Sequence, residues 1–200
     1  MIDFKLYLIT DRRLCRKPFL ECIEEVCREG IKAIQLREKE LSSRELLELA
    51  LSVREITSKY NVKLLINDRI DIAMITNADG IQLPENGLPI KIARRNFPKK
   101  LIGVSCHGIE RALIAENEGA DFIVFGSVFK KKHGSQPQGI DALKSICLKI
   151  KIPVFAVGGI TPENAGLCLK SGAYGVAVIS SIMSADNIAI QVRKLLDATE

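Results

Sequence analysis

The feature that most constrains the fold is a repeated alternation of short apolar runs with longer amphipathic segments. The short runs are rich in aliphatic and β-branched residues, and they occupy residues 5–9, 32–36, 63–67, 80–83, 101–105, 121–126, 153–158 and 174–179. Because they are apolar almost throughout rather than alternating, both faces of the sheet that they form must be covered. This pattern predicts a parallel sheet flanked by helices.

The spacing of the repeat predicts which parallel architecture forms. Eight strand–helix units in 200 residues leave roughly 25 residues for each, which suits a compact (β/α)8 TIM barrel. A doubly wound open sheet is the alternative, but its usual G-x-G-x-x-G turn is absent from the segment LITDRR at 8–13. No linker is visible. We therefore predict one α/β domain, a single TIM barrel over residues 1–200.

Composition narrows the classes of function. No apolar run reaches the roughly 18 residues of a membrane span, and the start of the chain lacks the pattern of a signal peptide, so we expect a cytoplasmic protein without membrane contact. The six cysteines form no C-x-x-C pair and are expected to be reduced. A net charge of +5 with only 5% aromatic residues favours a small anionic substrate over nucleic acid.

In a TIM barrel, the chemistry takes place at the carboxyl ends of the strands. The residues at these ends include cations, amides, carboxylates and paired glycines, which together predict a site for a phosphorylated small molecule. They are Thr10, Asp11, Arg12, Gln35, Arg37, Lys39, Asn67, Asp68, Arg69, Gln82, Glu85, Ser105, His107, Ser127, Gly158, Gly159, Ile179, Ser180 and Ser181.

Two motifs in this set predict anion binding. Gly158 and Gly159 allow backbone N–H groups to approach an oxyanion, and they are backed by Ser180 at the end of the neighbouring strand. A tight turn is the alternative reading of the glycine pair. In QLREK, Gln35, Arg37 and Lys39 alternate and so share one side of an extended segment, either as a phosphate clamp or as a solvated loop.

Other polar residues allow both a structural and a functional reading. Asn67 can cap the following helix, Asp68 can bind a metal or a base nitrogen, and Arg69 is expected to pair with Asp71. His107 is expected to lie near a helix start in a structural role. His133, in the loop FGSVFKKKHGSQPQG at 125–139, has a suitable pKa for proton transfer.

Several segments in order resemble one known family. They are LYLITDR, QLREK, NDRIDIA, ADGIQL, IGVSCH, GADFIVFGSVF, VGGITPENA and GAYGVAVISSI, and the family is that of thiamine phosphate synthase and its paralogue TenI, the thiazole tautomerase. The resemblance implies a TIM barrel and thiazole phosphate chemistry. For a synthase, it implies that Gln35, Arg37, Lys39 and Asn67 hold a hydroxymethylpyrimidine diphosphate, Asp68 binds Mg²⁺, Ser105 contacts pyrophosphate, and Gly159 with Ser180 holds the thiazole phosphate.

Three departures from the synthase pattern move the expectation towards TenI. Gln82 replaces a histidine, Gly87 replaces a second metal-binding aspartate, and the loop 125–139 lacks the T-x-T-K pattern of the synthases. The main hypothesis is therefore a TenI-like tautomerase that acts on a thiazole phosphate without a cofactor. Since the tautomerase histidine falls at Ser127, His133 and Glu38 are the alternative candidates for the acid/base.

The alternatives are a divergent thiamine phosphate synthase that uses Mg²⁺, and a non-catalytic thiazole-phosphate-binding regulator. Neither nucleic acid nor a membrane is an expected partner, and a homodimer is left open.

Overall fold

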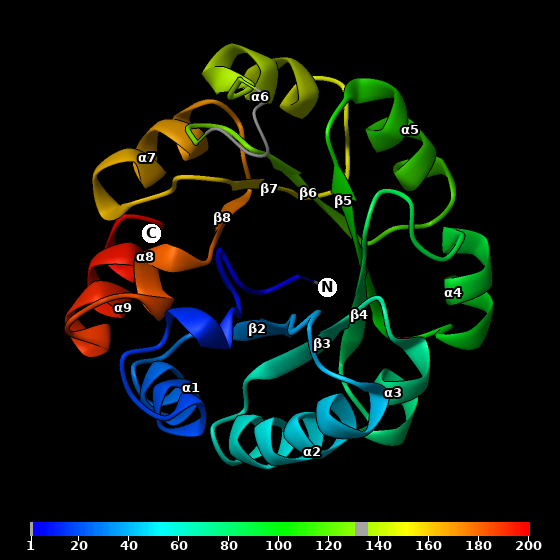
Figure 1. Ribbon diagram of the computed structural model, residues 1–200. Helices are drawn as coiled ribbons and strands as arrows, with labels where there is room; N and C mark the ends of the chain where they lie inside the picture. The colour runs from blue at the N-terminus through cyan, green and yellow to red at the C-terminus, as the bar shows by residue number, and fades with distance from the viewer. Residues whose placement is uncertain (1, 131–135) are drawn as a thin grey trace.

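The computed structural model describes residues 2–130 and 136–200, which form a closed barrel of parallel strands in the order β1 to β8. The helices surround the barrel as an outer ring (Figure 1). Each strand pairs in parallel with the next along the chain, and β8 closes the barrel against β1, where Leu8 lies opposite Val178. The predicted TIM barrel is confirmed.

The strands match the predicted apolar runs to within one residue at each end. The strands are β1 (Leu6–Ile9), β2 (Ala33–Leu36), β3 (Lys63–Asn67), β4 (Gly80–Leu83), β5 (Leu101–Cys106), β6 (Phe122–Gly126), β7 (Val154–Val157) and β8 (Gly175–Val178). The helices are η1 (Arg12–Leu14), α1 (Phe19–Arg28), α2 (Ser43–Lys59), α3 (Ile70–Ile75), α4 (Ile90–Asn96), α5 (Ile109–Asn117), α6 (Gly139–Cys147), α7 (Pro162–Lys170), α8 (Ser180–Met183) and α9 (Ile188–Asp197).

The apolar residues form two separate cores, which explains why the strands read as apolar on both faces. The larger core fills the layer between the barrel and the helices. The smaller core fills the barrel interior and is dominated by Phe4, Tyr7, Phe122 and Phe155. Alternate residues of each strand point to one core or the other, because side chains alternate across a strand.

Two further findings concern the cysteines and the membrane. All six cysteines are free thiols, and burial raises the pKa of Cys106 to about 12, which leaves it protonated and unreactive. In the part of the chain that the structure describes, the helices are too short or too polar to cross a membrane.

Candidate functional site

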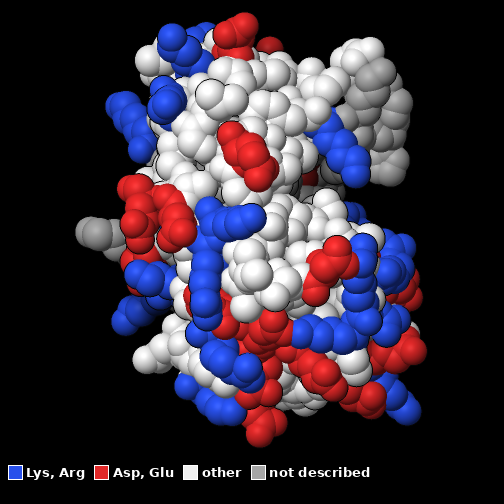
Figure 2. Space-filling model, turned by 90° about the vertical axis from the view of Figure 1, so that its left-hand side faces the viewer, with Lys and Arg blue, Asp and Glu red and all other residues white. Residues whose placement is uncertain are grey.

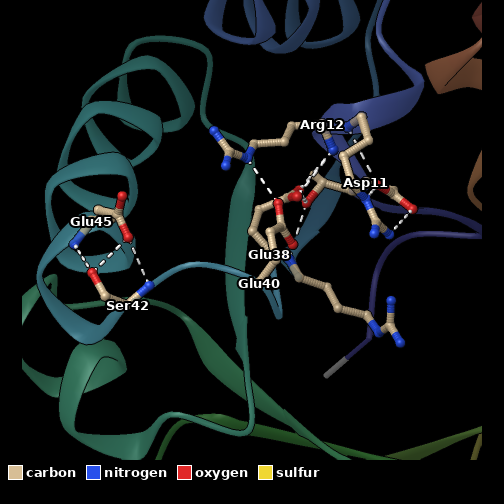
Figure 3. Close-up of polar contacts among 9 residues, drawn as sticks. Asp11, Arg12, Glu38, Glu40, Ser42 and Glu45 are labelled. Atoms are coloured by element: carbon tan, nitrogen blue, oxygen red, sulfur yellow. Dashed lines mark hydrogen bonds and ion pairs between the residues drawn. The ribbon is translucent and has the colours of Figure 1, made fainter.

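The carboxyl ends of β1 and β2 are joined by a buried hydrogen-bond network around Glu38. This side chain is 3% exposed, and it accepts hydrogen bonds from Thr10 Oγ1 at 2.5 Å and from the Arg12 backbone N–H at 3.0 Å. The Arg37 backbone N–H completes the network by donating to Thr10 Oγ1 at 3.0 Å. Glu38 therefore braces the loop after β1 against the loop after β2 (Figure 3).

The charge of Glu38 is poorly solvated in this network. Burial raises the pKa of its carboxyl group, and the hydrogen bonds from Thr10 and from the Arg12 backbone lower it only in part. Glu38 was a candidate acid/base at the level of the sequence. Here both of its oxygens already accept hydrogen bonds from the chain, so its contacts are those of a structural brace.

The cations on this part of the rim fall into two groups. Arg12 Nε pairs with Glu40 at 2.9 Å, and Arg13 Nε pairs with Asp11 at 2.8 Å. In contrast, Arg37 and Lys39 form no ion pair with any residue in 2–130 or 136–200. Two cations without an ion-pair partner among the described residues are suited to bind an anion.

Charge elsewhere is mixed. On the face that contains α8 and α9, Lys and Arg side chains intermingle with Asp and Glu, and a broad region is uncharged (Figure 2). Among the described residues visible there, the positive charges do not form a continuous patch of the kind that tracks a nucleic acid backbone.

A second group of polar residues lies on β3, β4 and β5. Asn67 ends β3, and Asp68 follows it with a φ of 60°, its backbone N–H donating to the Gln82 carbonyl at 2.9 Å. A Cβ atom placed on Gly87 would lie 3.0 Å from Asp68 Oδ1. Position 87 therefore faces the Asp68 carboxylate, and an aspartate there would stand beside it.

The structure corrects one prediction and confirms two others in this region. Asn67 does not cap α3: the N-cap is Arg69, without a side-chain cap, because the left-handed Asp68 turns the chain before the helix begins. Arg69 pairs with Asp71 at 2.5 Å, as predicted. His107 lies just before α5, also as predicted, and its Nδ1 contacts Glu85 Oε2 at 2.5 Å.

The barrel interior beneath these residues carries a chain of polar contacts. Gln35 Nε2 contacts the Tyr7 hydroxyl at 3.3 Å, the hydroxyl contacts Gln82 Oε1 at 3.5 Å, and Gln82 Nε2 donates to Ser105 Oγ at 3.2 Å. Three predicted substrate-binding residues, Gln35, Gln82 and Ser105, are thus connected through Tyr7. The sequence analysis missed Tyr7, although a phenol at an inward position of an apolar strand was a usable signal.

The loop after β6 begins with Ser127, whose hydroxyl donates to the Lys130 carbonyl at 2.6 Å. This contact holds the first turn of the loop together and occupies the hydroxyl proton of a candidate catalytic residue. His133, the other candidate on this loop, lies outside the described residues.

Two of the predicted phosphate-binding residues, Gly159 and Ser180, line a cavity at the ends of β7 and β8. Its volume is about 560 Å³, and Gly159, Thr161 and Ser180 are among its lining residues, as are Glu163 and Asp186. The turn is held by a capping box in TPEN: the Thr161 N–H donates to Asn164 Oδ1 at 2.8 Å, and Asn164 Nδ2 donates to the Gly159 carbonyl at 2.9 Å.

Gly158 and Gly159 also have a steric requirement for glycine. Their φ angles are 102° and 74°, and a Cβ atom on Gly158 would lie 1.9 Å from Ser127 Oγ. The tight-turn reading of the glycine pair is therefore confirmed, and Gly159 in addition lines the cavity. Ile179 precedes α8, which begins at Ser180 at the edge of the same cavity.

Comparison with known proteins identifies the family. The family model described as "Thiamine monophosphate synthase" matches residues 6–182. The chain belongs to the thiamine monophosphate synthase family. It is 45% identical to the thiamine-phosphate synthase of Clostridium novyi over 192 residues, covering 94% of each chain. It is 42% identical to the thiamine-phosphate synthase of Clostridium acetobutylicum over 200 residues, covering 98% of this chain and 95% of the relative.

A solved structure agrees with these relatives. The thiamine phosphate pyrophosphorylase from Pyrococcus furiosus superimposes with a TM-score of 0.90 at 39% identity, over 98% of this chain and 95% of that one. The family resemblance noted in the sequence is confirmed. These relatives carry the name of the synthase, which the sequence analysis held as the alternative, and they do not support its preference for a tautomerase.

Proposed function

We propose that the chain is a thiamine phosphate synthase, which joins a hydroxymethylpyrimidine diphosphate to a thiazole phosphate and releases pyrophosphate. In this reaction the bond between the pyrimidine methylene carbon and the diphosphate oxygen breaks, and the thiazole nitrogen forms a bond to that carbon. The observation that carries the proposal is that Arg37 and Lys39, which form no ion pair within the described residues, lie on the same rim as the cavity at β7 and β8 lined by Gly159 and Ser180.

The two substrates require two anion sites, and the rim offers both. Arg37 and Lys39 would hold the diphosphate and stabilise the charge that develops on it as it leaves. Gly159 and Ser180 would bind the thiazole phosphate through the cavity of about 560 Å³. The amides of Gln35 on β2 and Asn67 at the end of β3 would hold the pyrimidine ring.

The residues present also fit a magnesium ion, to which they would supply one carboxylate, that of Asp68. No group of three or more metal-ligating side chains is found in residues 2–130 and 136–200. Asp68 is exposed on the rim, and Gly87 beside it supplies no carboxylate. One carboxylate, completed by substrate phosphates and water, is a usual way for proteins to bind Mg²⁺. When bound, the ion would neutralise the charge of the leaving diphosphate.

The proposal is tested by incubating the purified chain with both substrates and Mg²⁺ and measuring thiamine phosphate by chromatography. Product that accumulates with enzyme concentration is expected. Arg37→Met should lower kcat/KM by at least a hundredfold, because it removes a cation from the leaving group. Arg13→Met is the matched control, since Arg13 is paired with Asp11, and it should change kcat/KM by less than threefold.

The same preparation separates the other two hypotheses. No thiamine phosphate at high enzyme concentration would reject the synthase. Conversion of the thiazole carboxylate phosphate tautomer above the buffer rate would then indicate a tautomerase. Tight binding of thiazole phosphate without turnover in either assay would indicate the regulator.

A further inference from the structure

A chain of hydrogen bonds crosses the barrel interior just below the rim and connects β1, β2, β4 and β5. Tyr7 stands at its centre, in contact with Gln35 Nε2 at 3.3 Å and Gln82 Oε1 at 3.5 Å, and Gln82 passes the chain on to Ser105 at 3.2 Å. Tyr7, Gln35 and Gln82 are no more than 2% exposed. Buried amides and hydroxyls must satisfy one another, so each contact restricts the next.

The position of the Tyr7 hydroxyl is fixed by the packing of its ring. The ring is fully buried and lies 5.6 Å from Phe4, 5.7 Å from Phe122 and 6.1 Å from Phe155, measured between ring centroids. Aromatic neighbours on three sides leave the phenol no alternative rotamer without repacking the core. Burial raises the pKa of Tyr7, so the hydroxyl keeps its single proton.

That single proton sets the donor-to-acceptor direction of the series of hydrogen bonds. A phenol donates once, and this proton goes to Gln82 Oε1, which leaves Gln82 Nε2 to donate to Ser105 Oγ. On the other side the hydroxyl accepts from Gln35 Nε2. Gln35 is thereby held with its Oε1 atom directed away from the hydroxyl.

The two ends of this series of hydrogen bonds are Gln35 Oε1 and the Ser105 hydroxyl. Among the described residues, only Arg111 Nε is both buried and without a hydrogen-bond partner, and no donor within the described residues contacts Gln35 Oε1. Within the described residues, the acceptor positions of Gln35 Oε1 are therefore left to a ligand. Ser105 Oγ accepts from Gln82, so its own proton is available to a ligand.

We propose that Tyr7 is a positioning residue whose hydroxyl orients the amides of Gln35 and Gln82, so that Gln35 Oε1 accepts from an N–H group carried by the ligand's ring and Ser105 Oγ donates to a ligand acceptor. The inference rests on the proposed function in one respect: the ring is taken to be that of the pyrimidine diphosphate. Without the hydroxyl, the Gln35 amide is free to turn over and present Nε2, and Gln82 Oε1 loses its donor.

Tyr7→Phe tests this role, because it removes one oxygen and keeps the ring that fills the core. Tyr174→Phe is a matched control: its hydroxyl donates to the Ile2 carbonyl at 2.9 Å, at the amino-terminal end of the barrel. Equilibrium binding of hydroxymethylpyrimidine diphosphate and of inorganic pyrophosphate is measured for both variants and the wild type. Steady-state kinetics and thermal unfolding are measured alongside.

Tyr7→Phe should weaken pyrimidine diphosphate binding on the order of tenfold, the effect of one lost hydrogen bond in a buried site. In the proposed arrangement Arg37 and Lys39 hold pyrophosphate and the two amides do not, so its Kd should stay within twofold. KM for the thiazole phosphate should also stay within twofold, and Tyr174→Phe should match the wild type in all of these measurements.

Unchanged pyrimidine diphosphate binding in Tyr7→Phe would overturn the inference. An equal loss of pyrophosphate binding would overturn it as well, because the hydroxyl would then support the barrel in general. A wild type without synthase turnover would refute the proposed function instead, while the two binding constants would still decide the role of Tyr7.

Discussion

Replacing Glu38 by alanine tests the brace between the loops after β1 and β2. The truncation leaves the buried Thr10 hydroxyl and the Arg12 N–H without an acceptor, and each such group costs about 1–3 kcal/mol. Removing a poorly solvated carboxylate offsets part of this cost. We expect a net loss of about 3 kcal/mol, or roughly 6–12 °C in Tm for a domain of this size.

Glu40→Gln provides the control for this variant. Glu40 pairs with Arg12 through the exposed guanidinium, and its side chain is 32% exposed. Exposed pairs contribute about 0.2–1 kcal/mol, so Tm should fall by no more than about 4 °C. Calorimetric unfolding of the two variants and the wild type measures the difference. A Glu38→Ala variant as stable as Glu40→Gln would refute the reasoning.

The pH dependence of Glu38→Gln provides a second measurement of the same brace. The folded-state pKa of Glu38 is raised, so above the ordinary value near 4.3 the folded protein retains a proton that the unfolded chain has lost. The stability that Glu38 contributes is therefore complete below that value and falls as pH rises through the folded pKa. Wild-type stability minus that of Glu38→Gln should decrease over this window, and a difference that increases would contradict the assigned pKa shift.

Three further substitutions probe the rim and the barrel. In Gly103→Ala, the new Cβ would lie 2.3 Å from Gln82 Oε1. We therefore expect the free energy of unfolding, measured in urea, to fall by several kcal/mol and pyrimidine diphosphate to bind more weakly. A variant as stable as the wild type would contradict this. In Gly158→Ala, the new Cβ would lie 1.9 Å from Ser127 Oγ, at a residue whose φ is 102°. The affinity for thiazole phosphate, measured by titration calorimetry, should therefore fall by at least tenfold. An unchanged Kd would exclude a role for this turn in binding. Arg94→Met removes the hydrogen bonds of one guanidinium to three carbonyls and a carboxylate. It should lower the free energy of unfolding by about 2–4 kcal/mol and leave the KM values unchanged. A larger effect on KM than on stability would argue against a purely structural role.

The barrel and the polar residues at its rim were readable from the sequence, because both follow from local pattern. Each apolar run is short, is followed by a helical pattern and ends in polar residues, and a parallel barrel brings all those ends to one rim. The glycine pair Gly158–Gly159 and the Arg69–Asp71 pair were predictable for the same reason, since their chemistry depends on near neighbours in the chain.

Tertiary structure decided the roles of the individual polar residues. The sequence places Gln35, Arg37 and Lys39 at alternate positions. It does not show that the side chain of Glu38 is buried and accepts a hydrogen bond from Thr10. Nor does it show that Tyr7 stands between Gln35 and Gln82, residues separated from it by 28 and 75 positions. Closing the barrel creates these contacts, because it brings together residues that lie far apart in the chain.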